Sequence, residues 1–383
     1  MTRYRLTGAE VVVPDGLRHL DVVISDATIE ALIDPSAPED GADTVALGGG
    51  LLAPGFIDLQ VNGGGGVLFN DETTRRGVEE IAAAHRPFGT CGMLPTLISD
   101  GPAALRAAVQ AVDEAMEAGV PGVLGVHLEG PFLNAQKKGI HDQQHFRALT
   151  PEELEVLTSL KRGKTLVTLA PETVRTEDIR ALVAHGVHVA LGHSLATYDE
   201  AKAAEAHGVT GYTHLFNAMP ALASREPGAI AAALEGGAWC GLIADGHHVD
   251  PAMLRLAIRA KIDKRFCLVT DAMPCAGTMM ESFDLGGQTI TVAGGACRGP
   301  DGTLAGSALT MDKAVRFALQ ELELSSRDAL RMASFEPAAF LRLSDDLGVI
   351  RPGARASLVH LDETYHVIRT VIDGSIETHR HPG

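Results

Sequence analysis

The chain has 383 residues, of which 45% are apolar, 21% charged and only 4% aromatic, a composition typical of soluble globular proteins. Its net charge of −17 argues against general nucleic-acid binding, and an anionic substrate would need local cationic groups. The amino terminus lacks an apolar signal core and no run of about 18 apolar residues occurs, so we expect no membrane span. The five cysteines form no CxxC pair, and their odd number fits reduced thiols in a cytoplasmic protein.

Both ends of the chain are rich in short β-branched segments broken by Gly, Pro and Asp. Residues 1–53 contain VVVPDG and HLDVVISDATI, and residues 348–383 contain GVIRPGARASLVHLD and YHVIRTVIDG. Segments of this kind predict short strands joined by tight turns. We therefore expect the two ends to fold together as a small side domain.

Residues 54–347 alternate between apolar, strand-like runs and helical stretches such as ALRAAVQAVDEAMEAG. Eight such units over about 290 residues match a (β/α)₈ barrel, an α/β fold whose functional residues lie at the carboxyl ends of the strands. The expected strands are residues 55–62, 90–97, 123–130, 165–170, 187–193, 209–214, 239–245 and 266–271.

Three of these strands end in a good ligand for a divalent metal, and a fourth ends in an aspartate. Glu129 ends VLGVHLEG, His193 ends VHVALGH, and His214 ends VTGYTH. Two imidazoles and one carboxylate match the three protein ligands of a catalytic zinc site with an open position. Asp271 ends FCLVTD, and a carboxylate beside a hydrated metal can accept a proton from water and later return it. The sequence predicts one site assembled from four strands that are far apart in the chain.

The first barrel strand carries three polar residues on one face. Asp58, Gln60 and Asn62 alternate with apolar residues, and we expect their side chains to point into the barrel mouth. They could take part in the site or form only a hydrogen-bonded polar plug. The glycine run that follows, residues 63–66, lets the backbone approach another group closely but lacks the spacing of a nucleotide loop.

Four more polar residues lie on or near these strand ends. His127 shares a face with Glu129, and we interpret it as structural. His141 lies in KKGIH, His248 in ADGHHVD and Arg225 in SREPG. Loops above a barrel carry substrate contacts, and arginine offers a planar set of donors that suits phosphate. Taken alone, each of these three loop residues could equally be an ordinary solvated side chain.

A series of longer motifs occurs in one order along the chain. They are PGFIDLQVNGGGG (54–66), HLEGPFLNAQKKGIH (127–141), TLAPE (168–172), GHSLATYDEA (192–201), THLFNAM (213–219), REPG (225–228), ADGHHVD (244–250), VTDAMPCAG (269–277) and GTLAGSALTM (302–311). Any one of them would be weak evidence, but together they are specific. With them the chain resembles the N-acetylglucosamine-6-phosphate deacetylase family of the amidohydrolase superfamily over nearly its whole length.

The resemblance implies a distorted (β/α)₈ barrel with a small β-sandwich domain formed by both chain ends. It assigns metal ligation to Glu129, His193 and His214, acid–base work to Asp271, and polarisation of the substrate carbonyl to His141. Substrate contacts implied by the matching motifs are Ile140, His141, Asn217, Ala218, Arg225, His248, Leu304, Ala305 and Gly306.

The resemblance also implies the reaction and the assembly. The expected reaction removes the acetyl group from N-acetyl-D-glucosamine 6-phosphate and yields D-glucosamine 6-phosphate and acetate, in amino-sugar catabolism and cell-wall recycling. Members of the family are commonly homodimers in which the phosphate-binding arginine, here Arg225, reaches across from the neighbouring subunit.

One departure from the wider superfamily concerns the number of metals. Many amidohydrolases carry His-x-His at the end of the first strand and hold two metals, whereas this chain has Gln60 and Asn62 there. Because amides are poor zinc ligands, we expect one divalent metal per subunit, with both amides bonding to water or to groups around the metal. Zn²⁺ is the expected ion, although Fe²⁺, Co²⁺ and Mn²⁺ can share such ligands.

Three alternatives stay open at this point. The same chemistry could act on N-acetylgalactosamine 6-phosphate, which differs at one hydroxyl that no motif reads. A cyclic-amide hydrolase would normally show the His pair and a carboxylated lysine, but the fourth expected strand has Lys164 near its start and no lysine at its carboxyl end. A non-catalytic sugar-phosphate sensor would usually lack the base or a ligand, and none is missing here.

Overall fold

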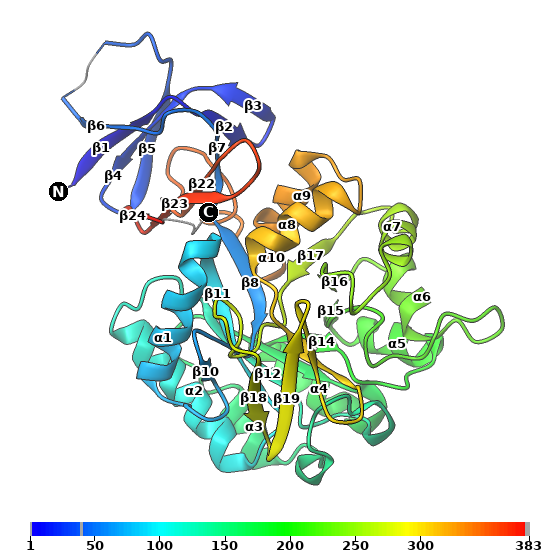
Figure 1. Ribbon diagram of the computed structural model, residues 1–383. Helices are drawn as coiled ribbons and strands as arrows, with labels where there is room; N and C mark the ends of the chain where they lie inside the picture. The colour runs from blue at the N-terminus through cyan, green and yellow to red at the C-terminus, as the bar shows by residue number, and fades with distance from the viewer. Residues whose placement is uncertain (1, 39–40, 380–383) are drawn as a thin grey trace.

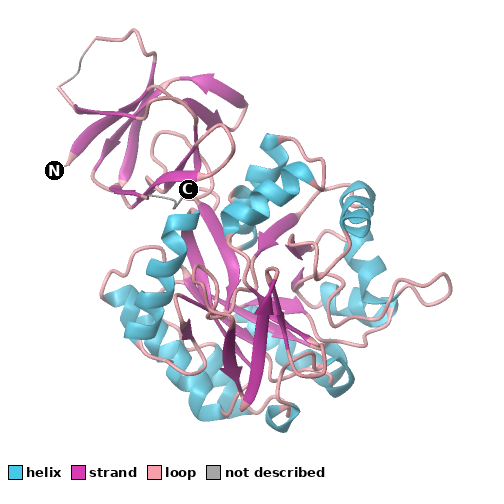
Figure 2. Ribbon diagram, viewed as in Figure 1, coloured by secondary structure: helices cyan, strands magenta, loops and turns pink. Residues whose placement is uncertain are grey.

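A computed structural model describes residues 2–38 and 41–379 of the chain. Sheets built from both chain ends lie together beside a barrel that is ringed by helices (Figures 1 and 2). The terminal strands form a four-stranded sheet in the order β5-β4-β1-β6 and a six-stranded sheet in the order β24-β23-β22-β7-β2-β3. Their bounds are β1 Arg3–Thr7, β2 Glu10–Val13, β3 Gly16–His19, β4 Asp21–Ser25, β5 Thr28–Ile33, β6 Asp43–Ala46, β7 Leu51–Pro54, β22 Leu358–Leu361, β23 Val367–Ile372 and β24 Ser375–Thr378.

The two terminal sheets share one apolar core. Leu6 and Ile24 from the first sheet pack in the same cluster as Val11 and Leu358 from the second. Strands β7 and β22 pair antiparallel, which joins segments from opposite ends of the chain. Burial of these side chains against one another is what an isolated two-sheet unit needs for stability. The expected β-sandwich from both chain ends is confirmed.

The central segment forms an eight-stranded parallel sheet in the order β17-β16-β15-β14-β13-β12-β11-β8. The strands are β8 Phe56–Val61, β11 Thr90–Ile98, β12 Gly125–Glu129, β13 Lys164–Leu169, β14 His188–Leu191, β15 Val209–Tyr212, β16 Trp239–Ile243 and β17 Phe266–Val269. The first and last strands meet near the carboxyl rim, where the Asp271 N–H donates to the Gln60 carbonyl over 3.0 Å. Closure there runs through an isolated bridge between Val61 and Ala272 rather than a full ladder. The predicted distorted (β/α)₈ barrel is confirmed, and every expected strand overlaps an observed one.

Helices cover the outside of the barrel (Figure 2), and their buried apolar residues belong to the same core cluster as those of the barrel strands. In α2, Pro102 occupies the first turn, and Leu105, Ala108 and Val112 are buried at helical spacing. The helices α3 and α5 begin at capping boxes of Thr150 and Thr197. The helices are α1 Arg75–His85, α2 Pro102–Glu117, α3 Pro151–Leu157, α4 Thr176–Ala184, α5 Tyr198–Ala206, α6 Gly228–Glu235, α7 Pro251–Ala260, α8 Met311–Gln320, α9 Ser326–Ala333 and α10 Phe335–Phe340.

An antiparallel sheet of four strands is inserted between β17 and α8, and it was not predicted from the sequence. It consists of β18 Ser282–Leu285, β19 Gln288–Ala293, β20 Ala296–Arg298 and β21 Leu304–Ser307, in that order. Its strands are short and are separated by two glycine pairs and by the turn GPDGT (299–303), so no long alternating pattern marks them. A two-stranded hairpin of β9 Gly63–Gly64 and β10 Val67–Leu68 also follows the first barrel strand. Both additions lie next to the carboxyl ends of β8 and β17, where site residues are expected.

Two further expectations concern the chain as a whole. Among the described residues, no helix is long and apolar enough to span a membrane. All five cysteines are buried and free of disulfides. The domain boundaries at residues 53 and 347 stay a prediction, and residues 1 and 380–383 of the terminal segments lie outside the described residues.

Candidate metal centre and active site

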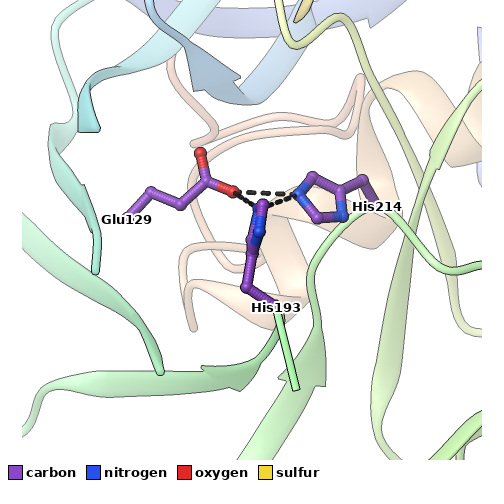
Figure 3. Close-up of side chains that lie close together, drawn as sticks. All are labelled: Glu129, His193 and His214. Carbon is purple, nitrogen blue, oxygen red and sulfur yellow. Dashed lines mark hydrogen bonds and ion pairs between the residues drawn. The ribbon is translucent and has the colours of Figure 1, made fainter. Parts of the chain in front are cut away.

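Three side chains from three barrel strands converge at the carboxyl rim (Figure 3). Glu129 ends β12, and His193 and His214 come shortly after β14 and β15. Oε1 of Glu129 lies 3.2 Å from Nε2 of His193 and 2.9 Å from Nε2 of His214, and these two nitrogens are 3.1 Å apart. All three residues are buried, and their ligand atoms lie within 4.8 Å of one another. One carboxylate and two imidazoles in this arrangement can hold a divalent metal.

The surroundings of His193 fix which of its ring nitrogens carries the proton. The carbonyl oxygen of Lys137 lies 2.7 Å from Nδ1 of His193, and a carbonyl can only accept a hydrogen bond. Nδ1 therefore carries a proton, so Nε2 is the nitrogen that can present a lone pair to a bound metal ion. The residues present fit a metal ion both in donor chemistry and in orientation.

The backbone is unusual at the same place. His193, His214 and Asp271 have φ values of 48°, 31° and 52°, a left-handed conformation that side-chain-bearing residues adopt rarely. Each residue lies two positions beyond the end of a barrel strand. Such conformations persist where the surrounding structure enforces them, and they concentrate at functional sites.

Two buried carboxylates, Glu129 and Asp271, dominate the electrostatics of the rim. Burial alone would raise the pKa of Glu129, but hydrogen bonds with His193 and His214 hold the pKa well below its ordinary value. Burial raises the pKa of Asp271, and the negative charge of Glu129 raises it further. In the part of the chain that the structure describes, no lysine or arginine forms an ion pair with either carboxylate. A divalent cation would balance this excess of negative charge.

The amide side chains of the first strand bond to these two carboxylates. The Gln60 amide donates to Oε2 of Glu129 over 3.0 Å and to Oδ1 of Asp271 over 3.1 Å. The Asn62 amide donates to the same Oδ1 of Asp271 over 2.7 Å. Lys164 lies at the amino end of β13 and so is not placed to bridge a second metal. The single-metal expectation stays a prediction that these contacts support.

His141 lies beside the cluster and is held by a residue that the sequence analysis missed. Its Nε2 is 4.0 Å from Oε2 of Glu129, and its ring centroid is 4.4 Å from that of His193. On the other side of the ring, Nδ1 contacts the backbone N–H and the hydroxyl of Ser99. Burial lowers the pKa of His141 to about 3, and nearby His193 adds to the effect. Ser99 directly follows β11, and its position at a strand end is the signal that could have identified it.

A cavity of about 280 Å³ opens over these residues. Most of the substrate contacts expected from the motifs line it, and so do His141, Asp271 and the three candidate ligands. The lining residues among the expected contacts are Ile140, Asn217, Ala218, His248, Leu304 and Gly306. The inserted sheet therefore supplies one wall of the cavity through β21. The individual roles of these residues stay predictions.

Two expected contacts are not in the cavity wall of this chain. Ala305 is buried beside it in β21, with its neighbours Leu304 and Gly306 in the lining. Arg225 is exposed in the long connection between β15 and α6, and it does not line the cavity. In Figure 1 this connection extends away from the barrel between β15 and α6. The expected role of Arg225 across a subunit interface stays a prediction.

The cavity also contains residues to which the sequence analysis assigned no role. Lys137 brings a positive charge to the wall, and its Nζ donates to the Met219 carbonyl over 3.0 Å. The other unassigned lining residues are Ile98, Gln136, Gly139, Met273 and Thr303. Lys137 lies four residues before His141 in the same motif, so a search of that motif for cations would have found it. His248, a predicted contact, is oriented by Asp245, whose carboxylate lies 2.7 Å from its Nδ1.

Two polar residues of the barrel interior lie outside the cavity. His127 contacts the Thr168 hydroxyl through Nε2 over 2.7 Å, and burial lowers its pKa to about 4. Asp58 accepts hydrogen bonds from the backbone N–H groups of Gln60 and Thr270 and from the Thr270 hydroxyl. Both residues thus hold barrel strands together beneath the rim.

A barrel that gathers a carboxylate, two imidazoles and a nearby aspartate at its carboxyl rim has the layout of a metal-dependent hydrolase. The sequence profile of the Amidohydrolase family matches residues 51–376, and the chain belongs to this family.

The chain is similar to several known deacetylases over most of its length. It is 41% identical to the N-acetylgalactosamine-6-phosphate deacetylase of a Shewanella species, covering 96% of this chain and 94% of the relative. It is 37% identical to the N-acetylglucosamine-6-phosphate deacetylase of Haemophilus influenzae, covering 94% and 95%. The crystal structure of the N-acetylglucosamine-6-phosphate deacetylase from Pasteurella multocida superposes with a TM-score of 0.95 at 34% identity, over 98% of this chain and 100% of that one.

Proposed function

We propose that the protein is a metal-dependent deacetylase of N-acetyl-D-glucosamine 6-phosphate, which it hydrolyses to D-glucosamine 6-phosphate and acetate. The observation that carries this proposal is the convergence of Glu129, His193 and His214 within 4.8 Å, beside Asp271 and at one wall of a cavity. The similarity to deacetylases of phosphorylated amino sugars supplies the substrate class. Amide hydrolysis needs an activated water and a proton for the leaving nitrogen, and the rim offers groups for both.

A divalent cation held by Glu129, His193 and His214, most simply one Zn²⁺ per subunit, would act as a Lewis acid and lower the pKa of water. Asp271 accepts the proton of the attacking water. Both amides of the first strand donate to its Oδ1, so Oδ2 is the oxygen left to take that proton. Asp271 then delivers the proton to the leaving nitrogen. Its raised pKa suits a group that must both accept and release a proton.

His141 polarises the acetyl carbonyl in this proposal. The ring lines the cavity with Nε2 toward the ligand cluster, so a hydrogen bond from Nε2 can stabilise negative charge that develops on the carbonyl oxygen. Removal of one such donor typically lowers the rate by roughly 10²–10³-fold. The neighbouring backbone and side chains of Ile140, Asn217, Ala218 and the Leu304–Gly306 turn would hold the sugar in place.

Charged and hydrogen-bonding side chains would bind the phosphate. We assign this role to His248 in the cavity wall and to Arg225 of a second subunit in a homodimer, because Arg225 lies outside the cavity of its own chain. Phosphate binding far from the scissile bond supplies free energy that can be used for orientation. The reduced, buried cysteines agree with an enzyme that works in the cytoplasm.

N-Acetylgalactosamine 6-phosphate is the second candidate substrate. A deacetylase of this sugar from Shewanella is 41% identical to the chain, and one from Escherichia coli O157:H7 is 38% identical. The two sugars differ only in the configuration of one hydroxyl, and no residue described above distinguishes them.

One experiment tests the proposal and separates the candidates. Metal-replete protein is incubated with each sugar phosphate in turn while acetate release is followed and metal is counted per chain. The proposal expects multiple turnovers, with a higher kcat/KM on the gluco sugar and about one metal per chain. A higher kcat/KM on the galacto sugar would favour the second candidate. Binding of both sugars without acetate release would contradict the proposal and favour a sensor.

A further inference from the structure

The ring of His141 is held by Ser99 from the side opposite the ligand cluster. Ser99 directly follows β11, the second barrel strand, so it stands at the same carboxyl rim as the ligands. Its backbone nitrogen lies 3.3 Å from Nδ1 of His141 and its hydroxyl oxygen lies 2.8 Å from the same atom. Both residues are buried, with 6% of Ser99 and 3% of His141 exposed. Two groups of one residue thus meet a single ring nitrogen in a water-poor environment.

The direction of these hydrogen bonds follows from donor and acceptor chemistry. A backbone N–H can only donate, so Nδ1 of His141 must present a lone pair to Ser99. The ring therefore has no proton on Nδ1, and its N–H is at Nε2. The Ser99 hydroxyl is 3.5 Å from the Glu129 carbonyl, much farther than its 2.8 Å to Nδ1, so the hydroxyl proton is also directed at the ring. The imidazole is the tautomer whose Nε2–H faces the cluster.

The backbone at Gly130 leaves room for the contact between the Ser99 hydroxyl and His141. A Cβ atom at Gly130 would come within 2.4 Å of the Ser99 hydroxyl oxygen. Gly130 directly follows Glu129, so the glycine after the candidate ligand is also the residue that admits the Ser99 side chain. A larger residue there would displace the hydroxyl from His141 as well as strain a backbone with φ of 81°.

We propose that Ser99 is a positioning residue that locks His141 in the Nε2–H tautomer, so that the ring is a ready hydrogen-bond donor to a carbonyl oxygen in the cavity. This inference rests on the proposed function for its kinetic consequence, but the tautomer itself is a property of the free protein. A ring free to exchange tautomers would spend part of its time with a lone pair toward the substrate oxygen, where it would repel developing negative charge.

The first experiment determines the tautomer without substrate. Full-length protein labelled with ¹⁵N at histidine is compared by NMR with His141→Asn, which identifies the signals of His141 by their absence. The inference expects a protonated Nε2 and an unprotonated Nδ1 at neutral pH. A protonated Nδ1 in the wild-type protein would overturn it. This result does not depend on which substrate the enzyme uses, so it separates failure of the inference from failure of the proposed deacetylase.

The second experiment tests whether Ser99 acts through His141. Ser99→Ala removes the hydroxyl and should lower kcat on N-acetylglucosamine 6-phosphate by roughly 3- to 10-fold, with KM changed less than about twofold. In a His141→Asn background the same substitution should change kcat by less than about twofold, because the group it positions is gone. An equal fractional loss in both backgrounds, or no loss in either, would overturn the inference.

A matched serine variant controls for loss of a buried hydroxyl. Ser334→Ala removes a hydroxyl that donates to the Leu330 carbonyl over 2.6 Å between two outer helices. It should leave kcat unchanged while costing comparable stability. Metal content of Ser99→Ala should equal that of the wild type, and a parallel loss of metal would overturn a role through His141.

Discussion

Buried carboxylates have different partners in the β-sandwich and at the barrel rim. In the sandwich, Asp21 is buried against Arg5, whose Nη2 lies 2.6 Å from its carboxylate, so the charge is neutralised within the protein. At the rim, Glu129 and Asp271 face imidazoles and amides, and the described residues pair neither with a lysine or an arginine. The sandwich pair is balanced within the chain, whereas the rim would be balanced by the divalent cation that we propose to bind there. The partners of the buried carboxylates thus differ between the two regions.

The largest expected effect is the loss of turnover when the proposed base at the rim, Asp271, is replaced. Asp271→Asn keeps the size of the side chain but cannot accept a proton, so kcat should fall by roughly 10²–10⁴-fold. Metal content should stay near that of the wild type, since Asp271 is not among the three candidate ligands. Steady-state acetate release and metal analysis of the same preparation measure both quantities.

The control for this variant is Asp250→Asn. Asp250 caps α7 through its side chain, and asparagine caps helices equally well, so the rate should not change. A near-normal rate of Asp271→Asn would remove this aspartate as the base.

The second prediction compares the same two regions by the stability of the protein instead of by its rate. Asp21→Asn leaves the Arg5 guanidinium buried without a counter-charge, and the free energy of unfolding should drop by about 3–5 kcal/mol. Asp271→Asn in metal-free protein should not lower it, because the change removes repulsion with Glu129. Urea unfolding of both variants after dialysis against chelator tests the contrast, and equal destabilisation by the two substitutions would contradict it.

The third prediction concerns Arg225, which does not line the cavity of its own chain. Arg225→Ala should lower kcat/KM for the phosphorylated sugar by roughly 10- to 100-fold, the usual value of a charged hydrogen bond. Unphosphorylated N-acetylglucosamine should lose less than about threefold, and Arg76→Ala, an exposed arginine on α1, should change neither. Equal losses on both sugars would refute a role in phosphate binding.

The smallest expected effect on stability comes from Asp58, another buried carboxylate, which the described residues pair with no lysine or arginine and which lies outside the ligand cluster. Burial raises its pKa to about 7. Between about pH 4 and pH 7 the folded protein therefore holds a proton that the unfolded chain has lost, so its stability falls as pH rises through this window. Relative to Asp58→Asn, the wild type should lose about 2–3 kcal/mol of unfolding free energy from pH 5 to pH 8. A pH-independent difference between the two proteins would contradict this assignment.

The sequence was sufficient to predict the barrel and the terminal sandwich, because buried parallel strands read as short apolar runs between amphipathic helices. It could not predict the sheet of β18 to β21, whose strands are three to six residues long and are separated by short glycine-containing turns. Half-exposed strands of this length carry too few alternating positions to stand out. The closure of the barrel near Val61 and Ala272 also depends on contacts that no local pattern encodes.

The candidate site was predictable to the extent that its residues end strands. Glu129, His193, His214 and Asp271 do so, and the structure brings them together. Ser99 also follows a strand, but a serine at a strand end can have many roles, so its position alone did not single it out. The left-handed backbone at the two histidines and the amide contacts to Asp271 arise only when distant strands meet. Such features cannot be predicted from local sequence patterns, because each depends on residues far away in the chain.

The central claim is that Glu129, His193 and His214 bind one divalent cation on which turnover depends. The most direct measurement counts metal per chain and follows acetate release before chelation, after it, and after readdition of Zn²⁺. The account predicts about one metal per chain, loss of nearly all turnover on its removal, and recovery when one equivalent is restored. Protein that deacetylates at full rate with no bound metal would contradict it.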